Sequence, residues 1–184
     1  MNSTFNTYEH DHTDHPLTST IKSPLIEKRN GTYAAVKYDE ASCAIIESLI
    51  KQWNIPNPIK TNHLHSTIIY SRKPIPVEKQ HNMDDVELKR RGWKFPIGSF
   101  KMLDTSSENH DGIVLVLMLD APELIALHDT LVVNGASHDF ATYDVHITLS
   151  YSAKGFDWSK IQIPDICLVP SEIYFEPLDL NWKD

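Results

Sequence analysis

Leu64-His65-Ser66-Thr67-Ile68-Ile69-Tyr70-Ser71 has the character of a short strand that carries a histidine and a hydroxyl two residues apart. A second stretch, Val145-His146-Ile147-Thr148-Leu149-Ser150-Tyr151-Ser152, places His, Thr, Tyr and Ser at the same positions, and its histidine follows the first by 81 residues. Residues i and i+2 of a strand point to the same face. Each histidine is therefore expected to project together with its threonine.

The surroundings of the two motifs also correspond. An expected strand at 33–38 matches one at 113–119, a helix at 40–53 matches one at 121–133, and strand 64–71 matches 145–152. Further strands are expected at 95–103 and 171–180, with a long polar segment before the first of them. These offsets of about 80 residues predict an internal duplication, with repeats at about 31–105 and 111–184 inside one bilobal domain of residues 31–184. Packing of the repeats about a pseudo-two-fold axis would bring the two His-x-Thr faces together across a groove.

The bulk properties restrict the class of protein. Of the 184 residues, 41% are hydrophobic and 23% are charged, as in a globular domain with a core. The net charge of −8 argues against general binding to long nucleic acid, but it allows a small anionic ligand in a locally basic pocket. The longest apolar run, Ile113 to Leu119, is too short to span a membrane. Cys43 and Cys167 lack metal-ligand spacing and are interpreted as reduced packing residues.

Residues 1–30 are expected to form a flexible extension. The segment is polar, shows no secretory signal and has no period of 2 or 3.6 residues. His10, His12 and His15 stand there among aspartates, so a metal site is conceivable, but a solvated tail is the favoured interpretation.

Paired histidines indicate acid–base chemistry near neutral pH, because one can accept a proton while the other donates one. The hydroxyls of Thr67 and Thr148 can donate hydrogen bonds to phosphoryl oxygens. No acidic cluster that would bind magnesium surrounds either motif. The pattern therefore predicts metal-independent cleavage of a phosphodiester by His65, Thr67, His146 and Thr148, and leaves open which histidine is the base. The alternatives are partly buried structural histidines and a zinc site at His63-x-His65.

The paired H-x-T-φ motifs resemble those of the 2H phosphoesterase superfamily. This resemblance covers residues 31–184 and implies a bilobal α+β fold with two antiparallel sheets around a central groove. Three local stretches are more specifically similar to the phage anti-CBASS cyclic-oligonucleotide phosphodiesterases. They are Tyr33-Ala34-Ala35-Val36-Lys37-Tyr38, Ile55-Pro56-Asn57-Pro58-Ile59 and Leu64 to Arg72.

The closer resemblance implies hydrolysis of 3′,5′ bonds in the cyclic di- and trinucleotide messengers of bacterial CBASS defence, without a cofactor, in the cytoplasm of the infected host. It also implies substrate-binding roles for Tyr33, Trp93, Glu176 and Trp182, with Glu172 as an alternative to Glu176. Two other functions remain open: an enzyme that opens 2′,3′-cyclic phosphates at RNA ends, and a non-catalytic cyclic-nucleotide sponge. The oligomeric state is left open.

The segment from Arg72 to Lys94 holds seven of the 17 basic residues. It could be a lid that attracts a phosphate ring, or a solvated loop whose acidic residues dilute the charge. His138 is expected at the surface, and His128 at the edge of the core.

Overall fold

The structure, a computed structural model, describes residues 31–104, 113–139 and 142–178. The expected extension at 1–30 and the candidate Trp182 lie outside these residues. The strands form two antiparallel sheets, which confirms the α+β class. One sheet has the order β2-β1-β7 and the other β5-β4-β3-β6. Their bounds are Thr32–Tyr38 for β1, His65–Ser71 for β2, Phe95–Asp104 for β3, Ile113–Leu119 for β4, His146–Ser150 for β5, Cys167–Leu168 for β6 and Pro170–Pro177 for β7.

The two long helices lie where the sequence predicts them. Helix α1, Glu40–Gln52, begins after Asp39, whose side chain accepts a hydrogen bond from the Ser42 amide at 2.8 Å. Helix α3, Pro122–Val133, has proline in its first turn, where a missing N–H costs nothing. The polar segment before β3 is more ordered than expected. It contains the 3₁₀ turn Val77–Lys79 and the short helix α2, Asp85–Arg91, which ends at a left-handed Gly92 (φ 67°).

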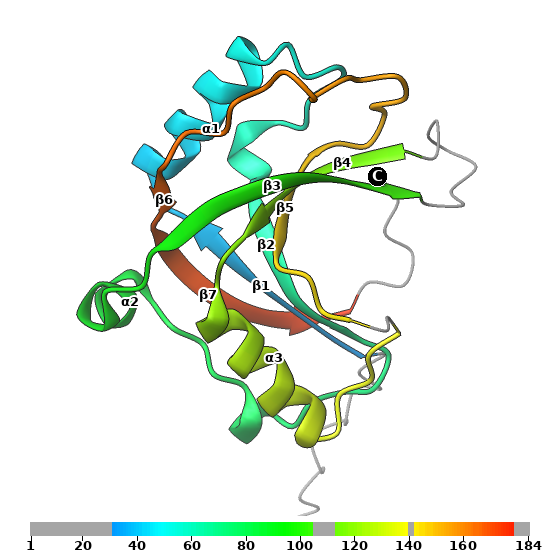
Figure 1. The fold of residues 1–184 in the computed structure, drawn as a ribbon. Helices are drawn as coiled ribbons and strands as arrows, with labels where there is room; N and C mark the ends of the chain where they lie inside the picture. The colour runs from blue at the N-terminus through cyan, green and yellow to red at the C-terminus, as the bar shows by residue number, and fades with distance from the viewer. Residues whose placement is uncertain (1–30, 105–112, 140–141, 179–184) are drawn as a thin grey trace, which may run out of the picture.

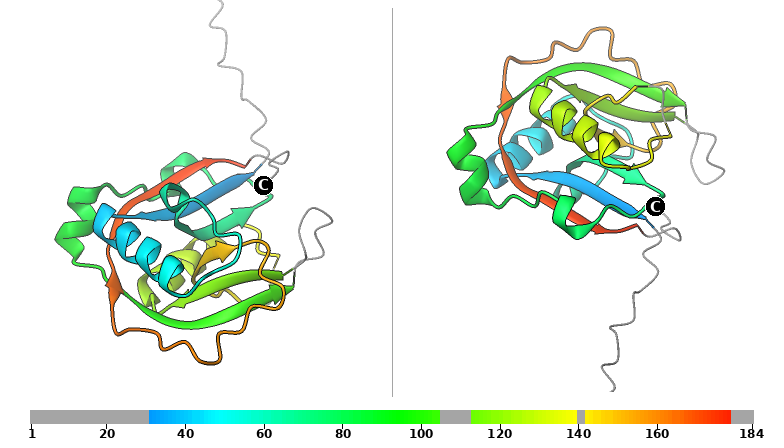
Figure 2. Two further views of the ribbon diagram at one scale, coloured as in Figure 1. Left: turned by 90° about the horizontal axis from the view of Figure 1, so that it is seen from above. Right: turned by 90° about the horizontal axis from the view of Figure 1, so that it is seen from below.

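Each half of the chain supplies elements to the other half. Strand β3 follows the first motif but pairs with β4, and β7 follows the second motif but pairs with β1. Helix α3 packs against β2, and the Trp53 ring at the end of α1 lies 5.0 Å from the Phe100 ring of β3. In Figure 1, α1 lies at the top and α3 at the bottom of the molecule. The views from above and below in Figure 2 each have one of these helices in front of the strands.

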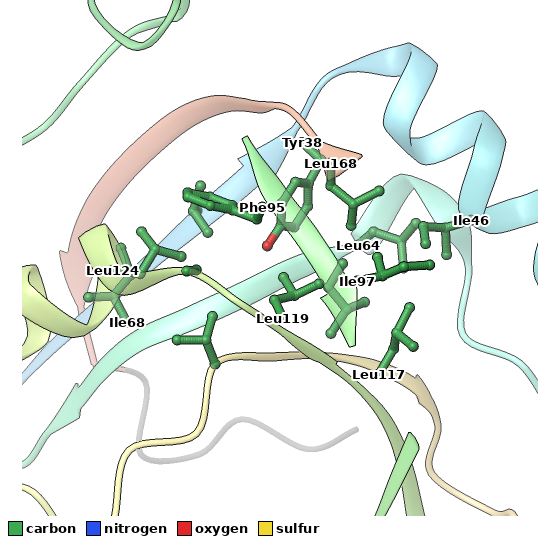
Figure 3. Close-up of a cluster of buried hydrophobic side chains, with 14 of the residues drawn as sticks. Tyr38, Ile46, Leu64, Ile68, Phe95, Ile97, Leu117, Leu119, Leu124 and Leu168 are labelled. Atoms are coloured by element: carbon green, nitrogen blue, oxygen red, sulfur yellow. The ribbon is translucent and has the colours of Figure 1, made fainter. Parts of the chain in front are cut away.

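One hydrophobic core therefore serves both sheets and both helices. Figure 3 shows side chains of this cluster from β2, β3, β4, α1 and α3 lying together. Ile46 of α1, Leu117 of β4 and Leu124 of α3 are each 1% exposed or less. Because the core is continuous, the two motif strands are held against each other by the packing of the whole domain. None of the described helices is long and apolar enough to cross a bilayer.

The two motif strands carry the same β-bulge. The pairing of β1 with β2 skips Ile68, because Ala34 lies opposite Ile69 and Ala35 opposite Thr67. The pairing of β4 with β5 skips Leu149 in the same way. A bulge inserts one residue and reverses the alternation of faces beyond it. Tyr70 and Tyr151 consequently share the exposed face of their motifs, although alternation alone would turn both toward the core.

Candidate active site

The motif strands β2 and β5 are edge strands of their sheets and contact each other. A cavity of about 740 Å³ opens beside them. His65, Thr67 and Thr148 line it, so the structure brings three of the four predicted catalytic residues to one space. The remaining lining residues are Tyr33, Lys37, Tyr38, Cys43, Ile59, Lys60, Asn62, Leu64, Tyr70, Tyr151, Tyr174, Glu176 and Leu178. His146 is not among them, but its partly buried ring is close enough to His65 for the two charges to interact.

His146 is held in one tautomer by the backbone. Its Nδ1 lies 2.7 Å from the carbonyl oxygen of Asp144, which can only accept, so Nδ1 carries the proton and Nε2 keeps the lone pair. The Asp144 carboxylate is in turn ion-paired with Lys101 of β3. Burial is the main cause that lowers the pKa of His146, and Lys101 and His65 lower it further, against the opposing effect of Asp144. This imidazole is therefore neutral at neutral pH.

Thr67 is held from two sides. Its Oγ1 lies 3.1 Å from the hydroxyl of Tyr33, and its carbonyl oxygen accepts a hydrogen bond from the Tyr143 hydroxyl at 2.9 Å. The Tyr143 ring stacks on His128 of α3, with ring centroids 4.1 Å apart. His128 is buried, and therefore lies deeper than the edge of the core where it was expected. The partly buried His138 packs on it, with ring centroids 4.4 Å apart. A chain of packed rings thus connects α3 to the backbone of the first motif.

A second hydrogen bond supports the same strand from the core side. The hydroxyl of Tyr38 in β1 lies 2.6 Å from Oγ of Ser66, the residue between His65 and Thr67. Both side chains are buried, and burial raises the pKa of the Tyr38 phenol far above its ordinary value. Tyr38 is therefore neutral and holds the motif strand at the position where both predicted catalytic side chains leave it.

The three-stranded sheet forms the aromatic wall of the cavity. Tyr33 lies opposite Tyr70 on β2 and Glu176 on β7. Its ring is 6.3 Å from the ring of His65 and 6.2 Å from that of Tyr174. Flat aromatic surfaces beside the predicted catalytic residue His65 suit the stacking of nucleobases.

The predicted binding residues do not all meet in this cavity. Tyr33 and Glu176 line it, whereas Glu172 lies further along β7 and pairs with Lys37 at 2.7 Å. Trp93 lies outside the cavity. The centroid of its ring is 6.3 Å from the centroid of the Phe95 ring and 5.4 Å from the Arg91 guanidinium carbon.

Several lining residues were not predicted as site residues, namely Lys37, Lys60, Tyr70, Tyr151 and Tyr174. For the tyrosines at 70 and 151, the repetition of Tyr in both motifs is a signal that the sequence does contain.

Ion pairs neutralise four of the seven basic residues in the segment from Arg72 to Lys94. Arg72 pairs with Asp139, Lys89 with Asp85, and both Arg90 and Arg91 with Glu87. Met83 forms a bridge with Ile173, which fixes the segment to β7. These contacts favour the solvated-surface interpretation over the lid. Within the described ranges of the chain, no three His, Cys, Asp or Glu residues lie together in a way that could hold a metal ion.

Comparison with known proteins places the chain in a family. The family model of the anti-CBASS protein Acb1 matches residues 30–184. The Acb1 protein of Acinetobacter phage Ac42 is 36% identical over 153 residues, which cover 83% of this chain and 94% of that protein. The Acb1 protein of Enterobacteria phage T4 is 35% identical over 155 residues, which cover 84% and 92%.

Among solved structures, Escherichia coli LigT complexed with 3′-AMP matches with a TM-score of 0.45 and 20% identity, over 79% of this chain and 86% of that one. The sequence relatives confirm the closer of the two resemblances drawn from the motifs. The chain belongs to the family of the anti-CBASS protein Acb1.

Proposed function

We propose that this protein is a phosphodiesterase that cleaves the 3′,5′ bonds of cyclic di- and trinucleotides without a metal ion. The observation that supports the proposal is the convergence of the two His-x-Thr strands on one cavity, with His65, Thr67 and Thr148 in its lining and His146 beside it. The anti-CBASS name of the family supplies the biological setting. In that setting the enzyme removes the messengers of CBASS defence in the cytoplasm of the infected bacterium.

His146 is the general base in this proposal. Its Nδ1 proton is committed to Asp144, its Nε2 lone pair is available, and its lowered pKa keeps it unprotonated near pH 7. His146 takes the proton from the attacking hydroxyl, which is either the ribose 2′-hydroxyl or a water. The new P–O bond forms while the bond to the 5′-oxygen breaks, and His65 donates a proton to that oxygen.

The threonine hydroxyls stabilise the charge that develops on the phosphoryl group. Thr67 Oγ1 lies 3.1 Å from the Tyr33 hydroxyl. With Tyr33 as the donor of that hydrogen bond, Thr67 donates its own proton to a non-bridging oxygen. Thr148 donates to the same group from the opposite strand. Donors fixed before the reaction need no rearrangement as the negative charge shifts, which is why such groups can contribute roughly 10²–10³ in rate. Tyr33 provides a surface for a base.

The test uses purified protein, cyclic di- and trinucleotides and EDTA, with chromatographic analysis of the products. We expect linear products with the wild type in EDTA, and a loss of roughly 10²–10⁴-fold in kcat for His65→Ala and for His146→Ala. A product that keeps a 2′,3′-cyclic phosphate identifies the 2′-hydroxyl as the nucleophile. The proposal would be refuted if the cyclic dinucleotides stayed intact although the full amount of wild-type protein was present.

Two further measurements separate the competing functions. A sponge binds cyclic nucleotides but releases no product, and its affinity survives the histidine substitutions. An enzyme of RNA ends opens 2′,3′-cyclic phosphates faster than it cleaves the cyclic dinucleotides. We expect the opposite order of rates, because the aromatic wall formed by Tyr33 and Tyr174 offers surfaces for the bases of a small ring.

A further inference from the structure

Lys37 holds a cationic position on the cavity wall that the proposed chemistry does not use. It stands on β1 directly opposite His65 of β2 and Glu172 of β7. Its Nζ lies 2.7 Å from Glu172 Oε2 and 4.5 Å from the centroid of the Tyr174 ring. Both partners are on β7, so the ammonium group extends away from the catalytic strand.

The position of this ammonium group separates it from the bond that is cleaved. Neighbouring strands lie roughly 4.8 Å apart, so β7 and β2 are about 10 Å apart across β1. The scissile phosphate must reach His65 and Thr67 on β2 and Thr148 on β5. A cation that lies over β7 is too far along the sheet to contact the same phosphate, but it remains on the wall of the same cavity.

The ion pair of Lys37 is suited to exchange. The Lys37 and Glu172 side chains are 52% and 47% exposed, and exposed pairs of this kind contribute little to folding stability. An incoming anion can therefore replace Glu172 without disturbing the fold. The protein carries a net charge of −8, so an anionic ligand needs a local cation. Among the lining residues that the structure describes, Lys37 and Lys60 supply that charge, and Glu176 is the carboxylate.

We propose that Lys37 binds a second phosphate of the substrate, one that is not cleaved, and that Glu172 occupies the lysine until that phosphate arrives. The inference rests on the proposed function, because a cyclic di- or trinucleotide carries a second phosphate in its ring. It makes Lys37 a residue that determines specificity for cyclic oligonucleotides over single cyclic phosphates. Glu172 acts as an internal competitor for the same site.

The two members of the pair have opposite effects in this scheme. Lys37→Met keeps the aliphatic stem and removes the charge, so we expect KM for cyclic di-AMP to rise about tenfold, the loss of one charge-assisted contact. Glu172→Gln removes the competing charge, so we expect KM to fall about threefold. Because the contact is the same in ground state and transition state, kcat should stay within about twofold in both variants.

Lys51→Met is the matched control. Lys51 forms a surface pair with Glu47 on α1 at 2.6 Å, with side chains 72% and 44% exposed, and lies outside the cavity lining. Lys51→Met changes the net charge by the same amount as Lys37→Met, so an unchanged KM in Lys51→Met excludes a general effect of charge. Calorimetry with cyclic di-AMP in a His146→Ala background measures the same affinities without turnover.

Failure of the subsite proposal can be distinguished from failure of the proposed function. If the wild type binds but does not cleave cyclic di-AMP, the catalytic proposal fails while the affinities still test the subsite. Affinity for cyclic di-AMP that is the same in Lys37→Met, Glu172→Gln and wild type overturns the subsite even when cleavage is normal. A large fall in kcat at unchanged KM in Lys37→Met also overturns it, because that result assigns the lysine to the reacting phosphate.

Discussion

The hydrogen bond between Tyr38 and Ser66 predicts a measurable coupling between the core and the first motif. The two oxygens are 2.6 Å apart, Tyr38 is 6% exposed and Ser66 is fully buried. Tyr38→Phe removes one partner and leaves the Ser66 hydroxyl buried without it, which costs about 1–3 kcal/mol of unfolding free energy. For a domain of this size, a loss of about 2 kcal/mol lowers Tm by about 4–8 °C.

Ser66→Ala should destabilise by a similar amount, because it leaves the Tyr38 hydroxyl unsatisfied instead. The double variant removes both polar groups and should lose less than the sum of the single losses, with a coupling of about 1 kcal/mol. Urea denaturation followed by circular dichroism measures all four proteins. Tyr70→Phe makes the same change at an exposed hydroxyl, and should alter stability by less than about 0.5 kcal/mol. Single losses that add within about 0.3 kcal/mol would show that the two hydroxyls do not interact, and would refute the reasoning.

Three further results are expected. In the pH profile of kcat/KM, Lys101→Met should move the acidic limb to higher pH, because Lys101 lowers the pKa of the base His146. Asp144→Asn should move the same limb to lower pH, because the Asp144 charge raises that pKa. Shifts of both variants in the same direction would contradict this electrostatic account. Thr148→Val should lower kcat roughly 10²–10³-fold while Thr148→Ser retains most of it, and equal activity of the two variants would remove the hydroxyl from the mechanism. Ile68→Ala, at a fully buried bulge residue, should lower the free energy of unfolding measured in urea by about 2–5 kcal/mol. A loss below about 1 kcal/mol would mean that the neighbouring side chains close the space left by the removed atoms, contrary to this expectation.

The order of elements was predictable because its signals are local. The apolar stripe of α1, the proline that opens α3 and the repeated motif each lie within a few turns or one strand, and each appears within about two residues of its predicted bounds. Helix α2 was missed because its seven residues are mostly charged and present only Leu88 to the core. Its Asp84 cap and Gly92 terminus were the available signals.

The exchange of β3 and β7 between the two halves could not be predicted in the same way. Both segments were expected as strands, but the pairing of a strand depends on partners far away in the chain. Besides β2, β1 pairs with β7, which lies more than 130 residues later, and nothing local to Thr32–Tyr38 specifies this second partner. The same limit applies to the site. Lys37 is an ordinary strand lysine in the sequence, and its place on the cavity wall follows only from the register that sets it between His65 and Glu172.

The shared bulge shows that part of this tertiary information was nevertheless present in the motif. Tyr70 follows His65 by five residues, an odd number, so in a regular strand its side chain would point to the opposite face. Two consecutive core residues, Ile68 and Ile69, make that alternation impossible, because both must be buried. The sequence of the second motif alternates regularly, and only the structure shows that Leu149 and Ser150 are both fully buried and that a bulge stands at the corresponding position. The two consecutive core residues of the first motif are therefore a sequence signal for a bulge, and the tyrosine that both motifs share extends the His-x-Thr pattern to residues that line the cavity.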